Sequence, residues 1–135
     1  MRFAIALDTA LRLFRERIEV PSQNSLVAPT LLRSQALSHL YTSVLRGELD
    51  MQNAASQLDQ MRLLKIRLLG DRVLQKVAWE IAEQLQWKDT FAAEYVALAK
   101  LQADAFVTLD DDLARFVKNI VPLAPFDELL TVRDT

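Results

Sequence analysis

Residues 3–7, Phe-Ala-Ile-Ala-Leu, form a short and uninterrupted apolar run that ends at Asp8. Residues 105–109, Ala-Phe-Val-Thr-Leu, repeat this design and end at Asp110. A short apolar run without polar alternation is typical of a central strand that is buried on both faces of its sheet. We therefore expect two buried strands, each with an aspartate at its carboxyl end.

Most of the remaining chain predicts helices. Apolar residues at helical spacing, with capping residues at the ends, predict helices that begin near Pro29, Asp50, Asp71 and Thr90 and shortly after Asp110. Gly47 is placed to end the first of these, and the first two together predict a helical hairpin. Three further elements are expected: a strand with one wet face over residues 64–68, a last strand over 120–122, and a helix or turn over 126–130.

Length and element order together predict the fold class. A chain of 135 residues is typical of one domain, and its 51% hydrophobic residues suffice for a packed core. Strands that alternate with helices favour parallel pairing, right-handed crossovers and helices on both faces of the sheet. We expect a single α/β domain over residues 1–135, a three-layer α/β/α sandwich around a central, mainly parallel sheet of four or five strands.

Composition excludes several classes of site. The chain has two glycines, Gly47 and Gly70, so neither a dinucleotide-binding G-x-G-x-x-G turn nor a P-loop can be written. It has no cysteine and one histidine, His39, which excludes thiolate zinc sites, disulfide scaffolds and H-E-x-x-H proteases. A metal would therefore be held by oxygen, which favours hard cations such as Mg²⁺ or Mn²⁺.

The charges nearly cancel, with 16 basic against 18 acidic residues, so net charge favours no nucleic-acid wrapper. They are nevertheless segregated, since residues 62–76 carry five bases and one acid, whereas residues 104–112 carry four acids and no base. Two interpretations stay open: steering of an anionic substrate, or ordinary solvated faces. The first apolar stretch is too short for a signal peptide and no run is long enough to span a bilayer, so we expect a soluble cytoplasmic protein.

The two strand-end aspartates predict a site. In open α/β sheets, ligands bind outside the carboxyl ends of the strands. Two neighbouring carboxylates repel each other, so they share a proton or recruit a divalent cation, and the cation supplies a Lewis acid. Metal-assisted phosphodiester hydrolysis uses such a pocket. The alternative is that each aspartate only caps a helix or forms a turn.

Four motifs carry a resemblance to a known family. They are Asp8-Thr9, residues 28–35 (Ala-Pro-Thr-Leu-Leu-Arg-Ser-Gln), residues 93–99 (Ala-Glu-Tyr-Val-Ala-Leu-Ala) and residues 107–110 (Val-Thr-Leu-Asp). Across essentially its whole length the chain resembles PIN-domain proteins, in particular the VapC-type toxins of bacterial toxin–antitoxin pairs. The resemblance implies an endoribonuclease that holds Mg²⁺ or Mn²⁺ with about four acids and is blocked by an antitoxin. Apolar residues of the hairpin between Pro29 and Met61 would serve antitoxin docking or a homodimer.

Carried over one residue at a time, the resemblance gives a depleted site. Asp8 matches the family's first acid, and Asp110 matches the acid after the Val-Thr-x strand. Gln35 stands where the family has Glu, and Ala92 stands where it has Asp. Glutamine keeps one acceptor oxygen but loses the charge, whereas alanine loses both. Asp112, just past the strand end, is a further candidate ligand of the metal.

Several neighbours are candidates to support this site. Thr9, Ser34 and Thr108 could orient the ligands through their hydroxyls, although capping and turn roles are common at such positions. Arg33 could contact an RNA phosphate, or it could be a solvated side chain. Tyr95 is expected in the core.

Two function classes follow. The first is a metal-dependent endoribonuclease in which Asp8, Gln35 and Asp110 are the catalytic positions. The second is a module that keeps the fold and binds antitoxin or RNA without turnover. The two missing acids fit three histories: a natural pseudo-nuclease, a weakened nuclease, or an enzyme disarmed deliberately.

Overall fold

The computed structural model describes residues 1–132. Its elements follow one another along the chain as β1 (Arg2–Ile5), α1 (Leu7–Glu16), β2 (Ser25–Pro29), α2 (Leu31–Leu45), α3 (Met51–Leu63), β3 (Arg67–Leu69), α4 (Arg72–Gln84), α5 (Phe91–Gln102), β4 (Ala105–Val107), α6 (Asp111–Val117) and the 3₁₀ helix η1 (Phe126–Leu130). The four strands form one all-parallel sheet in the order β3-β2-β1-β4. The predicted three-layer α/β/α architecture is confirmed, with four strands in its sheet.

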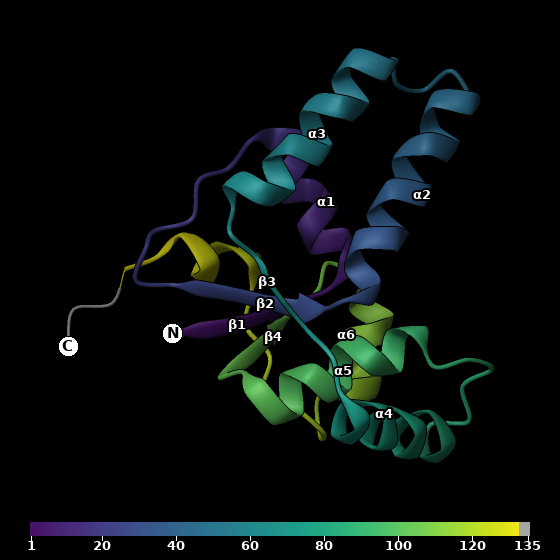
Figure 1. The fold of residues 1–135 in the computed structure, drawn as a ribbon. Coiled ribbons are helices and arrows are strands. Elements are labelled where there is room, and N and C mark those ends of the chain that lie inside the picture. Colours follow the sequence, from purple (N-terminus) through teal and green to yellow (C-terminus); the bar gives the residue numbers. More distant parts are fainter. Residues whose placement is uncertain (133–135) are drawn as a thin grey trace.

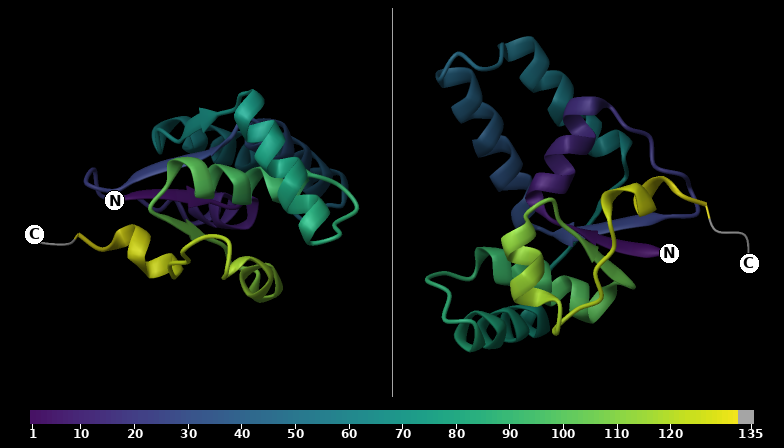
Figure 2. Two further views of the ribbon diagram at one scale, coloured as in Figure 1. Left: turned by 90° about the horizontal axis from the view of Figure 1, so that it is seen from below. Right: turned by 180° about the vertical axis from the view of Figure 1, so that it is seen from behind.

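The helices lie on two sides of this sheet. Helices α1, α2 and α3 lie on one side, and α4 and α5 lie on the other (Figure 1). Helices α2 and α3 extend away from the sheet as an antiparallel hairpin, which is the hairpin that the sequence predicts (Figures 1 and 2). From β1 the chain first builds the sheet toward β3, and it later returns to add β4 on the other side of β1. The boundary between β1 and β4 is therefore the point where the strand order reverses, at which open α/β sheets bind ligands.

The centre of the sheet is buried as predicted. Strand β1 buries Phe3, Ala4 and Ile5, and every residue of β4 is buried. Ala4 pairs with Val27 of β2 on one side and with Phe106 of β4 on the other. Both strands are thus covered on both faces, which explains their uninterrupted apolar sequence.

Local end signals position the helices. Asp50 accepts a hydrogen bond from the backbone N–H of Asn53 at 2.7 Å, and Asp71 accepts one from Leu74 at 2.8 Å. Gly47, just beyond α2, has φ of +72°, a left-handed conformation that glycine adopts without steric cost. The predicted caps of these three helices are confirmed.

Several predictions about the elements are wrong. The strand expected over residues 64–68 lies at Arg67–Leu69, because α3 continues to Leu63, and the strand expected over 105–109 ends at Val107. The first strand ends at Ile5 and not at Leu7, because α1 begins at Leu7; Asp8 therefore lies in the first turn of a helix. Strand β2 was not expected from the sequence; Pro29 ends this strand, and α2 begins only at Leu31. The last strand expected over 120–122 is reduced to one bridge between Phe106 and Leu123.

Candidate active site

The two aspartates singled out in the sequence lie at the boundary between β1 and β4. Asp8 is in the first turn of α1, which follows β1, and Asp110 is the N-cap residue of α6, which follows β4. Because β1 and β4 are paired in parallel, their carboxyl ends lie at the same edge of the sheet. Both aspartates therefore stand at helix N-termini, where the helix dipole favours negative charge.

The Asp8 carboxylate is held by three hydrogen bonds. Its Oδ1 atom accepts from the Thr9 hydroxyl at 3.0 Å and from the Leu109 backbone N–H at 3.1 Å. Its Oδ2 atom accepts from the Thr108 hydroxyl at 3.1 Å. Two of these donors come from the segment after β4, a hundred residues along the chain, so the fold fixes the orientation of Asp8 across the strand boundary.

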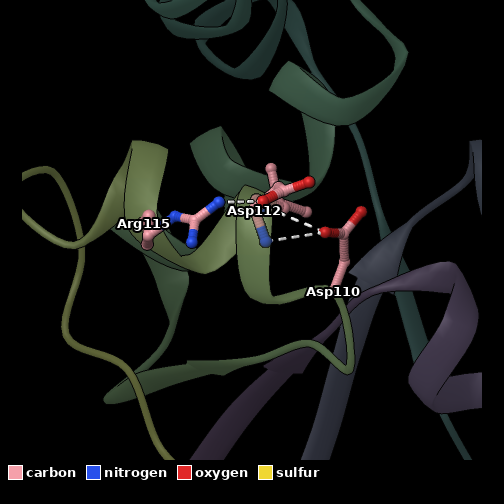
Figure 3. A network of polar contacts seen from close by, with 4 residues as sticks. Asp110, Asp112 and Arg115 are labelled. Atoms are coloured by element: carbon pink, nitrogen blue, oxygen red, sulfur yellow. Dashed lines mark hydrogen bonds and ion pairs between the residues drawn. The ribbon is translucent and has the colours of Figure 1, made fainter.

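Thr108 also connects Asp8 to Asp110. The same hydroxyl that donates to Asp8 accepts a hydrogen bond from the Asp110 backbone N–H at 3.1 Å. The Asp110 side chain uses only Oδ1 to cap α6, where this atom accepts from the N–H groups of Asp112 and Leu113 at 2.9 and 3.1 Å. Within residues 1–132 the second oxygen of Asp110 accepts no hydrogen bond, and in Figure 3 it points away from α6. The cap and a ligand role are therefore compatible in Asp110.

The Asp112 side chain is paired with Arg115 and not with the candidate metal ligands. Its carboxylate forms an exposed ion pair with Arg115, one turn further along α6 (Figure 3). Among residues 1–132, no three or more Asp, Glu, His or Cys side chains gather closely enough to hold a metal ion. The structure therefore brings Asp112 near Asp110 but does not make it the third member of an acidic cluster with Asp8.

Gln35 is held by a hydrogen bond from Tyr95 of α5. The Tyr95 hydroxyl donates a 2.7 Å hydrogen bond to Gln35 Oε1, and its ring is buried as predicted. Burial, followed by the negative charges of Glu94 and Asp8, raises the pKa of Tyr95, so the phenol remains protonated and continues to donate.

Tyr95 is the site residue that the sequence prediction missed. Its apolar surroundings and buried ring identified it as core, which is correct but incomplete. One feature of the sequence could have identified Tyr95 as a site residue. It lies three residues after Ala92 and therefore shares a helix face with the position of the missing acid.

Ala92 lines a groove together with Asp110. This groove has a volume of about 360 Å³, and Ala92 enters it from the first turn of α5. The other lining residues are Trp87, Lys88, Asp89, Asp112, Leu113 and Phe116. A longer side chain at position 92 would project into the space beside Asp110.

The remaining candidates divide into two groups. Thr9 is fully buried, and its hydroxyl lies 3.0 Å from both Asp8 Oδ1 and the Val107 carbonyl oxygen, so Thr9 and Thr108 both support Asp8. Ser34 instead donates to the Leu31 carbonyl of its own helix at 3.1 Å. Arg33 is exposed on α2, and within residues 1–132 its guanidinium has no hydrogen-bond or ion-pair partner.

A larger cavity than this groove lies away from the two aspartates. It measures about 940 Å³ and opens beside the amino ends of β1 and β2, with Arg2, Arg17, Lys65 and Arg67 among its lining residues. Lys65 and Arg67 belong to the basic segment of the sequence, yet they do not line the groove at Asp110.

Two sequence comparisons identify no relative. No protein-family model matches the chain, and no curated protein sequence is significantly similar to it. In the described part of the chain, none of the helices combines the length and the hydropathy needed to cross a membrane.

Proposed function

We propose that the chain is a PIN-like, Mg²⁺- or Mn²⁺-dependent endoribonuclease of the toxin type, with a partly depleted acidic site. The observation that carries the proposal is the Thr108 hydroxyl, which hydrogen-bonds both Asp8 and the backbone of Asp110 where the strand order reverses. The Asp8 carboxylate is fixed by hydrogen bonds, and within residues 1–132 one carboxylate oxygen of Asp110 accepts none. This arrangement fits the binding of a cation better than it fits two aspartates that act only as separate helix caps.

The donor set fits one hard cation. Mg²⁺ commonly takes one or two protein carboxylates and keeps several waters, and Asp8 and Asp110 supply two carboxylates. Gln35 is the third position that the resemblance assigns to the metal, and its amide oxygen already accepts a hydrogen bond from Tyr95. When bound, the metal would act as a Lewis acid for the phosphate and make water a better nucleophile.

The protein's own groups orient the ligands in advance. Thr9, Thr108 and the Leu109 N–H hold Asp8 in one orientation, so little side-chain entropy is lost when the carboxylate binds a cation. Gln35 and Ala92 reduce the negative charge available for that cation, because neither can supply a carboxylate. We therefore expect weak metal binding and slow turnover.

The test restores the missing charges. Purified protein is incubated with structured RNA and Mn²⁺ and compared with the double variant Gln35→Glu/Ala92→Asp and with Asp8→Asn. Asp111→Asn is the matched control, because it removes one carboxylate from α6, the helix that Asp110 caps, without changing Asp8, Gln35, Ala92 or Asp110. The double variant Gln35→Glu/Ala92→Asp should cleave RNA faster by orders of magnitude. Asp8→Asn should abolish cleavage, and Asp111→Asn should leave its rate unchanged. If the double variant folds but cleaves no faster than the parent protein, the assignment of the site is refuted.

The absence of a three-acid cluster within residues 1–132 favours a second candidate, a module without turnover. Helix α2 exposes Leu37, Tyr41 and Leu45 at four-residue spacing, so they form one apolar stripe on the protruding hairpin. A cytoplasmic antitoxin or a second copy of the chain would cover this stripe. This module would bind RNA or antitoxin equally well with and without Asp8→Asn, and the restored variant would not cleave RNA.

A further inference from the structure

The groove that contains Ala92 and Asp110 is also lined by two aromatic side chains, Trp87 and Phe116. Phe116 of α6 is 58% exposed, although the next residue, Val117, is fully buried. Trp87 is half-buried and packs against the core, so its indole is held in place where it lines the groove. Exposed apolar surface rimmed by polar groups is typical of a binding site.

The rim of the groove narrows the class of ligand. It carries one cation, Lys88, and three carboxylates, Asp89, Asp110 and Asp112. Asp112 is paired with Arg115, but within residues 1–132 neither Asp89 nor Asp110 has a salt-bridge partner, so a broad apolar protein surface placed here would desolvate two unpaired charges at a high energetic cost. A small planar group with N–H donors on its edge and an attached anion avoids this cost. Its face would cover the aromatic side chains, while the donors on its edge would hydrogen-bond to the carboxylates.

We propose that this groove binds one nucleobase of an RNA strand, stacked on Phe116 and Trp87, with Lys88 contacting the attached phosphate. Base stacking on aromatic side chains is tolerant of sequence, because every base offers a π face. Asp110 belongs both to the groove and to the candidate metal pair, so the bound base would be adjacent to the scissile phosphate. The inference rests on the proposed function and names the part of the substrate that this edge of the site recognises.

Intrinsic fluorescence provides a direct test, since the chain has only two tryptophans. Trp79 is 67% exposed on α4, and within residues 1–132 its indole N–H donates only to Glu83. Trp79→Phe therefore leaves Trp87 as the sole reporter with little effect on the fold. This variant is titrated with a single-stranded tetranucleotide RNA in the presence of EDTA, so that binding is measured without cleavage. We expect saturable quenching of Trp87.

Three substitutions in the Trp79→Phe background locate the ligand. Phe116→Ala should weaken binding by about 5- to 100-fold, from the usual worth of one stacked base. Phe116→Leu keeps apolar area and should recover only part of the affinity. Lys88→Gln should weaken binding and reduce its dependence on salt. Tyr41→Ala, which removes an equally exposed aromatic ring from α2, should leave the affinity unchanged.

Two results would overturn the inference: quenching that Phe116→Ala leaves unaffected, or a change in oligomeric state, rather than in RNA affinity, when Phe116 is replaced. Its failure is separable from that of the proposed function. If Gln35→Glu/Ala92→Asp cleaves RNA with the same KM with and without Phe116→Ala, the groove assignment is wrong and the nuclease assignment stands. If RNA quenches Trp87 through Phe116 but no variant cleaves, the groove assignment stands and the nuclease assignment is wrong.

Discussion

Replacing Thr108 by valine tests the connection between the two aspartates most economically. Valine keeps the branched shape that suits the end of β4 but removes the hydroxyl. Two hydrogen bonds are lost, one to the Asp8 carboxylate and one from the Asp110 N–H, each 3.1 Å long.

The expected cost follows from these two bonds. A hydrogen bond to a charged group contributes about 1.5–3 kcal/mol and a neutral one about 0.5–1.5 kcal/mol. Asp110 is exposed and Asp8 is half-buried, so water replaces part of what is lost. We therefore expect Thr108→Val to lower the free energy of unfolding by roughly 1–3 kcal/mol.

Urea denaturation measures this loss as a lower midpoint at an unchanged m-value. Thr108→Ser is the matched control, because it keeps the hydroxyl and loses only a methyl group, and it should cost less than the valine variant. A double-mutant cycle with Asp8→Asn should give a coupling energy of about 0.5 kcal/mol or more. The reasoning is refuted if Thr108→Val is as stable as the parent protein, or if Thr108→Ser loses as much as Thr108→Val.

Three further predictions concern stability. Gly47→Ala should destabilise the protein by about 1 kcal/mol, because alanine is strained at φ of +72°. Gly47→Asn should cost less, because asparagine tolerates this conformation better. The prediction is contradicted if both variants are as stable as the parent protein. Asp71→Ala should cost about 1 kcal/mol through the lost cap of α4, and Asp71→Ser should recover most of it in the same denaturation experiment. The raised pKa of Tyr95 means that the folded state keeps the phenol proton above pH 10.0, where the unfolded chain releases it. Stability should therefore fall as the pH rises above about 10, and Tyr95→Phe should flatten this decline in urea midpoints recorded from about pH 9 to about pH 11; an unchanged decline would count against the buried donor.

Much of the framework is encoded locally and could be predicted. Strands β1 and β4 can be recognised in the sequence, because burial on both faces requires a continuous run of apolar residues. Asp50 and Asp71 identify helix starts because a cap acts over only three residues. The convergence of Asp8 and Asp110 follows from topology, since parallel neighbours end at the same edge of a sheet.

Two elements were missed although their signals are present. Leu7, Leu11 and Phe14 recur at the spacing of a helix that spans Leu7–Glu16, but no helix was predicted there. Strand β2 is a short apolar run that ends at Pro29, and this proline was interpreted as the start of the following helix. Proline also suits the end of a strand, where no further ladder bond is needed.

The finer parts of the site depend on packing between distant segments. Gln35 and Tyr95 are 60 residues apart, and their hydrogen bond exists only because α2 and α5 both reach the same edge of the sheet. The groove around Phe116 likewise combines residues that precede α5 with residues of α6. No local pattern encodes either contact, so sequence periodicity could not predict them.

The central claim is that Asp8 and Asp110 together bind one hard cation. Anomalous diffraction from crystals soaked in Mn²⁺ tests it directly. The account predicts a single Mn²⁺ peak in contact with both carboxylates, and its loss in Asp8→Asn crystals. No peak between the two side chains at saturating Mn²⁺, or a peak held by other residues, would contradict it.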